Sequence, residues 1–168
     1  GDVYKRQNQD IVKPYSYEYP NAKFVEGKHP WEVKADIALC CATQNEINLE
    51  DAKNIVANGT KYVCEVSNMG CTAEAAQYFL DNKILLGPGK AVNAGGVAVS
   101  GLEMSQNSMK YSWSAEEVDT KLKSIMKNIH TACVEHGTEE DGYVNYIKGA
   151  NIAGFMKVAN AMLDQGIV

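Results

Sequence analysis

The sequence lacks a long hydrophobic run and lacks any block of basic residues. No apolar stretch approaches the ~20 residues of a membrane span, and no basic segment followed by an apolar stretch opens the chain. Lys and Arg number 16 against 21 Asp and Glu, which gives a net charge of -5. This balance provides no electrostatic attraction for nucleic acid or an anionic membrane. We therefore expect neither as a partner.

The sequence also lacks the cysteine spacing of a disulfide framework. Its cysteines are odd in number, which suits a reducing compartment, and we expect a cytoplasmic protein in which they pack as small apolar side chains. A redox role for adjacent Cys40 and Cys41 is the alternative. His130, Cys133 and His136 share a helical face, but no fourth ligand completes a tetrahedral zinc site. The five cysteines are Cys40, Cys41, Cys64, Cys71 and Cys133.

No standard phosphate-binding motif is present. Gly87-Pro88-Gly89 follows an apolar segment, but Val92 stands where a Rossmann fingerprint requires its third glycine. Gly89-Lys90 lacks the spacing and the hydroxyl residue of a P-loop. The chain therefore lacks the usual cradle for a pyrophosphate, and its residues alone indicate a ligand-binding part of an α/β domain without specifying the ligand.

Short apolar segments alternate with helical ones between residues 35 and 86. The pattern predicts strands at 35–40, 61–66 and 84–86, separated by helices at 48–58 and 72–82. Strands alternating with helices imply a parallel sheet, and ligands of such sheets bind at the carboxyl ends of the strands. An asparagine follows each strand: Asn45, Asn68 and Asn93. A further short strand is expected at 22–25.

The chain after residue 88 is predicted to be helical. Near Asn93 a helix contains Gly95 and Gly96, which cost about 1 kcal/mol each relative to alanine. We expect unpaired N–H groups at this helix start to face an anion or carbonyl, with close helix packing as the alternative. Ser114 and Glu117 form a capping box for a long amphipathic helix, and a last helix is expected at 143–165.

Four runs resemble a known family. They are ADIALCCATQNEI (35–47), GPGKAVNAGGVAVSGLEMSQN (87–107), IHTACVEHG (129–137) and YIKGANIAGFMKVANAML (146–163). Together they resemble the C-terminal part of hexameric bacterial glutamate dehydrogenases, which are mostly NADP-dependent, over residues 19–168. Leucine and phenylalanine dehydrogenases share the architecture but have an apolar residue where Ser100 stands.

The resemblance implies an α/β fold that is the second half of a Rossmann-like, parallel-sheet dinucleotide-binding domain followed by long C-terminal helices. We expect residues 1–18 to be disordered or non-native, 19–110 to form the half-domain with its pocket helix, and 111–168 to form helices that return to a substrate domain. That substrate domain, with its acid–base residues, is absent from this sequence.

The resemblance also implies site residues. Val97 and Ser100 correspond to the glutamate pocket, where the serine hydroxyl donates to the side-chain carboxylate. A carboxylate removed from water requires such donors. The alternative for Ser100 is a hydrogen bond back to its own helix. The positions that correspond to the cofactor site are Ala42, Thr43, Gln44, Asn45, Asn68 and Asn93.

Two departures from the resembled family lie near these loops. Many members have Pro where Cys40 stands, and Pro-Thr where Gly70-Cys71 stand. These changes leave the expected fold intact but alter the loops that face the cofactor.

The implied activity is the reversible oxidative deamination of glutamate to 2-oxoglutarate and ammonia with NADP, NAD being the alternative cofactor. The full-length parent is expected to be a homo-hexamer, and this chain alone to be inactive. Other interpretations are a non-catalytic dinucleotide-binding or interaction module, a related amino-acid dehydrogenase, or a structural piece without a ligand.

Overall fold

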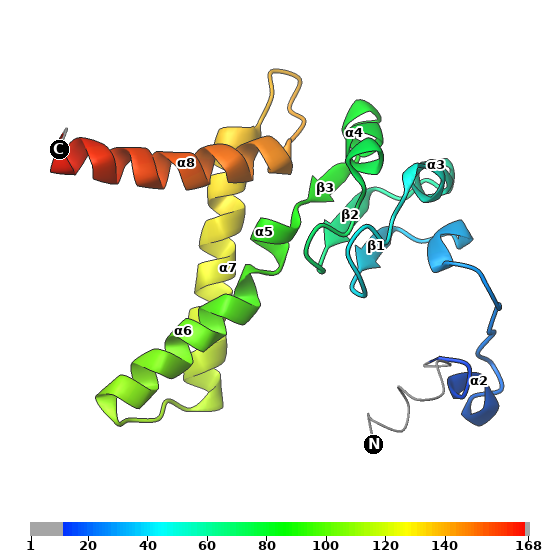
Figure 1. Cartoon of the computed structure of the whole chain (residues 1–168), viewed down its shortest axis with the longest axis horizontal. Helices are drawn as coiled ribbons and strands as arrows, with labels where there is room; N and C mark the ends of the chain where they lie inside the picture. Colours follow the sequence, from blue (N-terminus) through cyan, green and yellow to red (C-terminus); the bar gives the residue numbers. More distant parts are fainter. Residues whose placement is uncertain (1–11, 167–168) are drawn as a thin grey trace. The chain divides into compact units, whose positions relative to one another are not determined.

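A computed structural model of the chain describes residues 12–166 (Figure 1). The chain divides into two units after Pro30. Residues 1–11, which include most of the segment predicted to be disordered or non-native, lie outside the described part.

Between residues 12 and 30, the first unit contains one helical turn, α2 (Tyr15–Glu18). The rings of Tyr15 and Tyr19 stack with centroids 4.3 Å apart, and Lys13 Nζ lies 5.7 Å from the ring centroid of Phe24. The strand predicted at 22–25 is wrong, because these residues have no regular secondary structure. A strand forms only as part of a hydrogen-bonded ladder, and no strand is present in residues 12–30 to pair with it.

The second unit is built on a parallel sheet, as predicted. Its strands are β1 (Ile37–Cys40), β2 (Tyr62–Glu65) and β3 (Leu85–Gly87), in the order β1-β2-β3. Each lies within one or two residues of its predicted position. The register aligns Ile37 with Tyr62 and Leu85, so the three carboxyl ends meet at one edge. The α/β fold class is confirmed.

The crossover helices α3 (Leu49–Ala57) and α4 (Ala73–Asp81) supply the core. Asn48 caps α3 and forms a capping box with Asp51, and Gly59 ends the helix with a φ of 81°. The sheet residues that pack with α3 and α4 alternate with residues on the other face, as the two-residue strand period requires. The largest fully buried side chains are Phe79, Ile47, Leu86, Val63 and Cys40.

The remaining elements are helical. The Pro30–Glu32 segment is a 3-10 turn, η1. Helix α7 begins after the capping box of Ser114 and Glu117, which confirms the predicted cap. The last helix begins at Tyr146, later than predicted, because Val144 forms a β-bridge with Thr138. The C-terminal helices are α5 (Gly89–Val92), α6 (Ala94–Met109), α7 (Ala115–Gly137) and α8 (Tyr146–Gln165).

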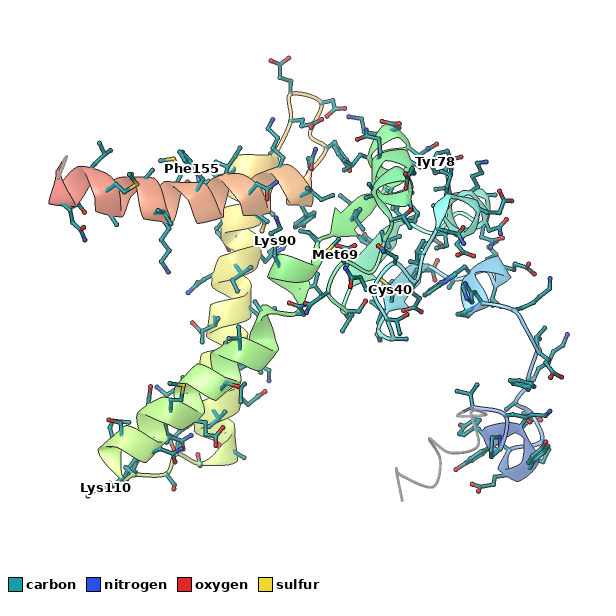
Figure 2. The ribbon with its side chains drawn as sticks, viewed as in Figure 1. Cys40, Met69, Tyr78, Lys90, Lys110 and Phe155 are labelled. Carbon is teal, nitrogen blue, oxygen red and sulfur yellow. The ribbon has the colours of Figure 1, made fainter. Side chains whose placement is uncertain are left out.

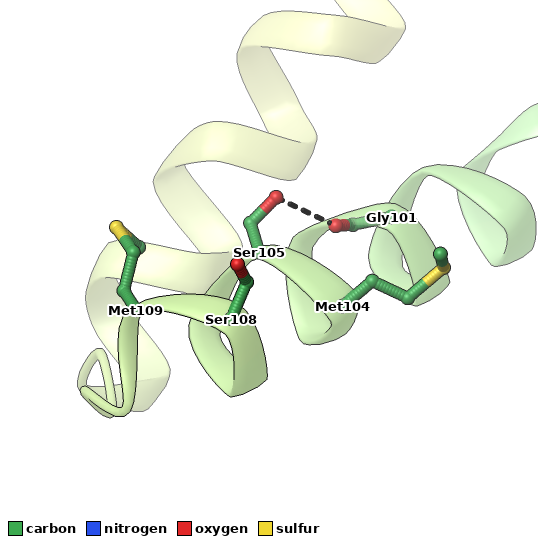
Figure 3. Close-up of a pocket in the computed structure, with 5 residues that line it drawn as sticks. All are labelled: Gly101, Met104, Ser105, Ser108 and Met109. Atoms are coloured by element: carbon green, nitrogen blue, oxygen red, sulfur yellow. Dashed lines mark hydrogen bonds between the residues drawn. The ribbon is translucent and has the colours of Figure 1, made fainter.

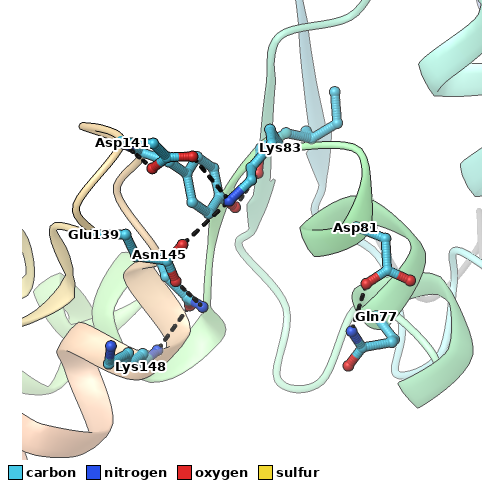
Figure 4. A network of polar contacts seen from close by, with 9 residues as sticks. Gln77, Asp81, Lys83, Glu139, Asp141, Asn145 and Lys148 are labelled. Atoms are coloured by element: carbon cyan, nitrogen blue, oxygen red, sulfur yellow. Dashed lines mark hydrogen bonds and ion pairs between the residues drawn. The ribbon is translucent and has the colours of Figure 1, made fainter.

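The loop between α7 and α8 is fastened to the loop before β3. Lys83 Nζ lies 3.2 Å from Glu139 Oε2 and 3.3 Å from Asp141 Oδ2 (Figure 4). Hydrogen bonding to Glu139, and then to Asp141, raises the pKa of Lys83. Tyr143 donates its hydroxyl to the Ile84 carbonyl oxygen over 2.8 Å. These contacts hold the α7–α8 loop against the residues that precede β3.

Helices α7 and α8 cross in close contact at Gly149. A Cβ placed on Gly149 would overlap the Cys133 carbonyl oxygen, whereas a Cβ on Gly154 would have no neighbour within 4 Å. Of these two glycines, only Gly149 requires a missing side chain.

The two glycines provide a matched test of helix packing. We expect Gly149→Ala to destabilise the chain by about 1–3 kcal/mol, because the overlap forces α7 and α8 apart. The same change at Gly154 should stabilise it by about 0.5–1 kcal/mol through helix propensity. Urea unfolding followed by circular dichroism measures both. Equal effects at the two positions would contradict this packing.

The two departures from the resembled family lie in contact. A Cβ on Gly70 would overlap Cys40 Sγ, so the buried sulfur occupies the space that a larger residue at position 70 requires. Hydrogen bonding from Cys71 lowers the pKa of Cys40, and the same bond together with burial raises that of Cys71. The Cys40 thiol itself donates to the Cys64 carbonyl oxygen over 3.4 Å. Cys41 is exposed, with its thiol near the Leu39 carbonyl oxygen.

This contact predicts energetic coupling between positions 40 and 70. We expect Gly70→Ala alone to cost about 1–3 kcal/mol through overpacking. In a Cys40→Ala background the sulfur is gone, so the same change should cost less. A double-mutant cycle from urea unfolding measures the difference, and strictly additive costs would show that the sulfur does not restrict position 70.

Candidate functional site

Two loops are joined by hydrogen bonds at the carboxyl edge of the sheet. Asn45, with a φ of 55°, donates its N–H to the Met69 carbonyl oxygen over 2.7 Å. The Ser67 hydroxyl donates to the Thr43 carbonyl oxygen over 3.2 Å. Met69 is labelled near Cys40, the last residue of β1, in Figure 2. The 42–45 loop after β1 and the 67–71 loop after β2 therefore form one continuous surface.

The four predicted cofactor residues of the first loop are all exposed. Ala42 donates its N–H to Glu46 Oε2 over 3.0 Å, and Gln44 Nε2 lies 3.3 Å from Met69 Sδ. Their backbone is held by Glu46 and by the second loop, while the Thr43 and Asn45 side chains are accessible. A ligand at this edge would meet preorganised polar groups.

Asn68 and Asn93 are brought together from different segments. Asn93 Nδ2 donates to Asn68 Oδ1 over 2.6 Å. Asn93 is half-buried at the junction between α5 and α6, while Asn68 is exposed in the loop after β2. This bond uses neither the Asn68 amide N–H₂, a donor, nor the Asn93 amide oxygen, an acceptor.

A one-turn helix, α5 (Gly89–Val92), precedes α6, which begins at Ala94, close to the predicted start. The Asn93 N–H donates to the Gly89 carbonyl oxygen over 2.9 Å, and the Gly96 N–H to the Asn93 carbonyl oxygen over 3.3 Å. The expectation of unpaired backbone donors is therefore wrong for these two groups. Pro88 lacks an N–H and precedes the first residue of α5, and this additional turn supplies the Gly89 carbonyl oxygen that accepts from Asn93.

Val97 and Ser100 lie on the face of α6 that points away from α7. A Cβ on Gly95 would lie 3.4 Å from Leu122 Cδ1 of α7. Val97 and Ser100 are rotated from Gly95 by roughly 140–200° about the helix axis. Both are exposed, Val97 by 73%. Gly95 thus faces α7, where a Cβ would make ordinary van der Waals contact, whereas a Cβ on Gly96 would have no neighbour within 4 Å.

The Ser100 hydroxyl has no hydrogen-bond partner among residues 12–166. A bond back to its own helix was the alternative for Ser100, and it is Ser105 that makes one, to the Gly101 carbonyl oxygen over 2.9 Å (Figure 3). The surface hollow drawn there presents two methionines and two serines and carries no charged side chain. The role of Ser100 in substrate binding stays a prediction.

A second hollow lies on the sheet face opposite α3 and α4. It has a volume of about 240 Å³ and is lined mainly by apolar residues of β2, β3, α5 and α7, such as Leu85, Val92 and Ile129. His130 Nδ1 lies 3.4 Å from the Tyr146 hydroxyl at this hollow. None of the predicted site residues lines it.

Residues 12–166 contain no group of three His, Cys, Asp or Glu side chains placed to hold a metal ion. In the same residues no helix has the length and apolar character needed to cross a membrane.

Glu65 is the polar residue at this edge that the sequence did not single out. As the last residue of β2 it accepts N–H groups from Cys71 over 2.8 Å and from Gly89 over 3.0 Å. No sequence motif marks it, because its two partners are six and 24 residues away. The only signal was an acidic residue at the end of an apolar strand.

Comparison with known proteins gives consistent matches. Residues 2–166 match the profile of the Glutamate/Leucine/Phenylalanine/Valine dehydrogenase family. The NAD-specific glutamate dehydrogenase of Bacteroides fragilis is 65% identical over 164 residues, 98% of this chain and 37% of that protein. The NADP-specific glutamate dehydrogenase of Haemophilus influenzae is 52% identical over 97% of this chain and 36% of its own length.

A solved structure is similar in fold. The crystal structure of Plasmodium falciparum glutamate dehydrogenase superposes with a TM-score of 0.89 at 43% identity, over 98% of this chain and 35% of that one. The chain thus spans about a third of the length of the relatives it matches. It belongs to the Glutamate/Leucine/Phenylalanine/Valine dehydrogenase family.

Proposed function

We propose that the chain is the nicotinamide-facing and glutamate-facing part of a cytoplasmic glutamate dehydrogenase. The whole enzyme would interconvert glutamate with 2-oxoglutarate and ammonia. The observation that carries the proposal is the junction at the carboxyl edge, where Asn68 and Asn93 meet over 2.6 Å beside the 42–45 loop. Similarity to named glutamate dehydrogenases over nearly the whole chain supports it.

The carboxyl edge of the sheet offers polar groups that suit the nicotinamide end of a dinucleotide. The free donor of Asn68 and the free acceptor of Asn93 complement a carboxamide, which has one acceptor and one donor group. Open space around Gly96 allows a flat ring to approach α6. The chain lacks a glycine-rich turn for the pyrophosphate, so that group would be held by residues outside this sequence.

In the proposed reaction, the nicotinamide cofactor exchanges the hydride, and residues of this chain orient the cofactor and the substrate. When bound, the nicotinamide supplies or accepts the hydride exchanged with the α-carbon of glutamate. Asn68 and Asn93 would orient the carboxamide, and Ser100 would donate to the side-chain carboxylate of the substrate, as a desolvated anion requires. The iminoglutarate that results is hydrolysed by water with the help of acid–base groups outside this chain.

The cofactor of this chain is proposed to be a nicotinamide dinucleotide. Resemblance to the family favours NADP, whereas the named relatives are divided: the Bacteroides fragilis protein is NAD-specific and the Haemophilus influenzae protein NADP-specific. Enzymes with this fold distinguish NADP from NAD at the ribose 2′ position, through a residue about 20 positions beyond the glycine-rich turn. That segment is not in this sequence. Homo-hexameric assembly is part of the same proposal.

The first prediction concerns the chain alone. We expect the 168-residue chain to show no turnover of glutamate with NADP or NAD, because proton transfer without a positioned acid–base group is slower by about 10²–10⁴-fold. Absorbance of the reduced nicotinamide at its near-ultraviolet band measures this. Turnover above background would contradict it, and tight dinucleotide binding by calorimetry would favour the alternative of a binding module.

The second prediction concerns Ser100. The chain replaces the matching segment of the Bacteroides fragilis enzyme, and Ser100→Ala is introduced. We expect KM for glutamate to rise by roughly 10- to 100-fold, since a hydrogen bond to a charged group is lost. Ser105→Ala is the matched control, because its hydroxyl bonds only its own helix. An unchanged KM in Ser100→Ala would remove Ser100 from the substrate site.

A further inference from the structure

Glu65 connects three segments at the carboxyl edge of the sheet. It ends β2, and its two carboxylate oxygens accept different backbone N–H groups. Oε1 accepts from Cys71, at the end of the 67–71 loop, over 2.8 Å. Oε2 accepts from Gly89, the first residue of α5, over 3.0 Å. One half-buried side chain therefore holds the loop after β2 and the helix after β3 at a fixed separation.

The same two segments also touch directly. A Cβ on Gly89 would lie 3.0 Å from the Ser67 carbonyl oxygen and 3.6 Å from the Met69 nitrogen. The helix start is therefore pressed against the loop, and a side chain there would move one of them. This contact and the Glu65 carboxylate independently fix the same separation.

That separation decides whether Asn68 and Asn93 can meet. Asn68 is in the loop that Glu65 holds through Cys71, and Asn93 is one helical turn beyond Gly89. Their amide hydrogen bond of 2.6 Å tolerates little displacement, since such bonds weaken steeply with distance and angle. The carboxylate is well suited to hold both segments because charge-assisted hydrogen bonds are stronger than neutral ones.

Glu65 is half-buried and each of its oxygens accepts a backbone N–H group, so it acts on the proposed cofactor site through the segments that it holds. We propose that Glu65 is a positioning residue for dinucleotide binding, which sets the Asn68–Asn93 pair by bridging the Cys71 and Gly89 N–H groups. This inference rests on the proposed function and adds a residue that governs cofactor affinity.

The test uses the Bacteroides fragilis enzyme in which this chain replaces the matching segment. We expect Glu65→Gln to raise KM for the dinucleotide about 10-fold, because an amide presents only one acceptor to two N–H groups. KM for glutamate, measured at saturating dinucleotide, should stay unchanged, since neither N–H group that Glu65 accepts belongs to α6, the helix of Ser100. Glu117→Gln is the control: Glu117 accepts the Ser114 N–H over 2.7 Å in the capping box of α7.

A merely structural role would give a different result. It would lower the melting temperature and the active fraction of Glu65→Gln, with both KM values unchanged, and that outcome overturns the inference. Gly89→Ala is a second variant that displaces the same segments without altering the carboxylate, and it should also raise KM for the dinucleotide. If neither variant changes this KM while the parent chimera turns over glutamate, Glu65 does not position the site.

Failure of the proposed function can be distinguished experimentally from failure of the positioning role of Glu65. If the parent chimera shows no turnover, the proposed function is wrong and the positioning role falls with it. Hydrogen exchange on the chain itself provides a readout without activity: the Cys71 and Gly89 amides should exchange faster in Glu65→Gln than in the parent. Unchanged exchange at both amides would also overturn the inference.

Discussion

Parallel pairing of three short strands is the constraint on which the site depends. Because β1, β2 and β3 run in the same direction, the 42–45 loop, the 67–71 loop and the turn into α5 all emerge at one edge. The polar side chains that follow each strand then lie close together without any local sequence signal. An antiparallel arrangement of the same segments would place alternate loops at opposite edges.

Rigidity at this edge comes from hydrogen bonds between the loops. Two hydrogen bonds join the loop after β1 to the loop after β2: one between Asn45 and Met69, and one between Ser67 and Thr43. Glu65 then ties the second loop to α5. Side chains left exposed on such a braced backbone are suited to orient a ligand, because little conformational freedom remains to be lost on binding.

The helical part is organised by close backbone approach. Gly149 allows α8 to cross α7 at the Cys133 carbonyl, and the Lys83 network holds the intervening loop against the end of the sheet. Apolar side chains farther along the helices are exposed, among them Phe155 at 70% and Leu163 at 79%. In the proposed function, the substrate domain of the whole enzyme is the partner of these helices.

Local patterns in the sequence determined the secondary structure of the second unit. The alternation of apolar runs with capped helices placed three strands within one or two residues, and capping residues such as Asn48 and Ser114 act as predicted. These features depend on neighbours within a few positions, which a sequence displays directly. The strand expected at 22–25 failed for the converse reason, since a strand also requires a partner.

Only the tertiary structure decided which residues act on one another. It distinguished Gly149, which contacts Cys133, from Gly154, and Gly95, which packs on α7, from Gly96. It also gave Glu65 its two N–H partners. Such contacts join residues far apart in the chain, and residue type alone does not reveal them. The sequence could thus supply the candidate site residues, whereas their spacing and support followed from how the loops and helices pack.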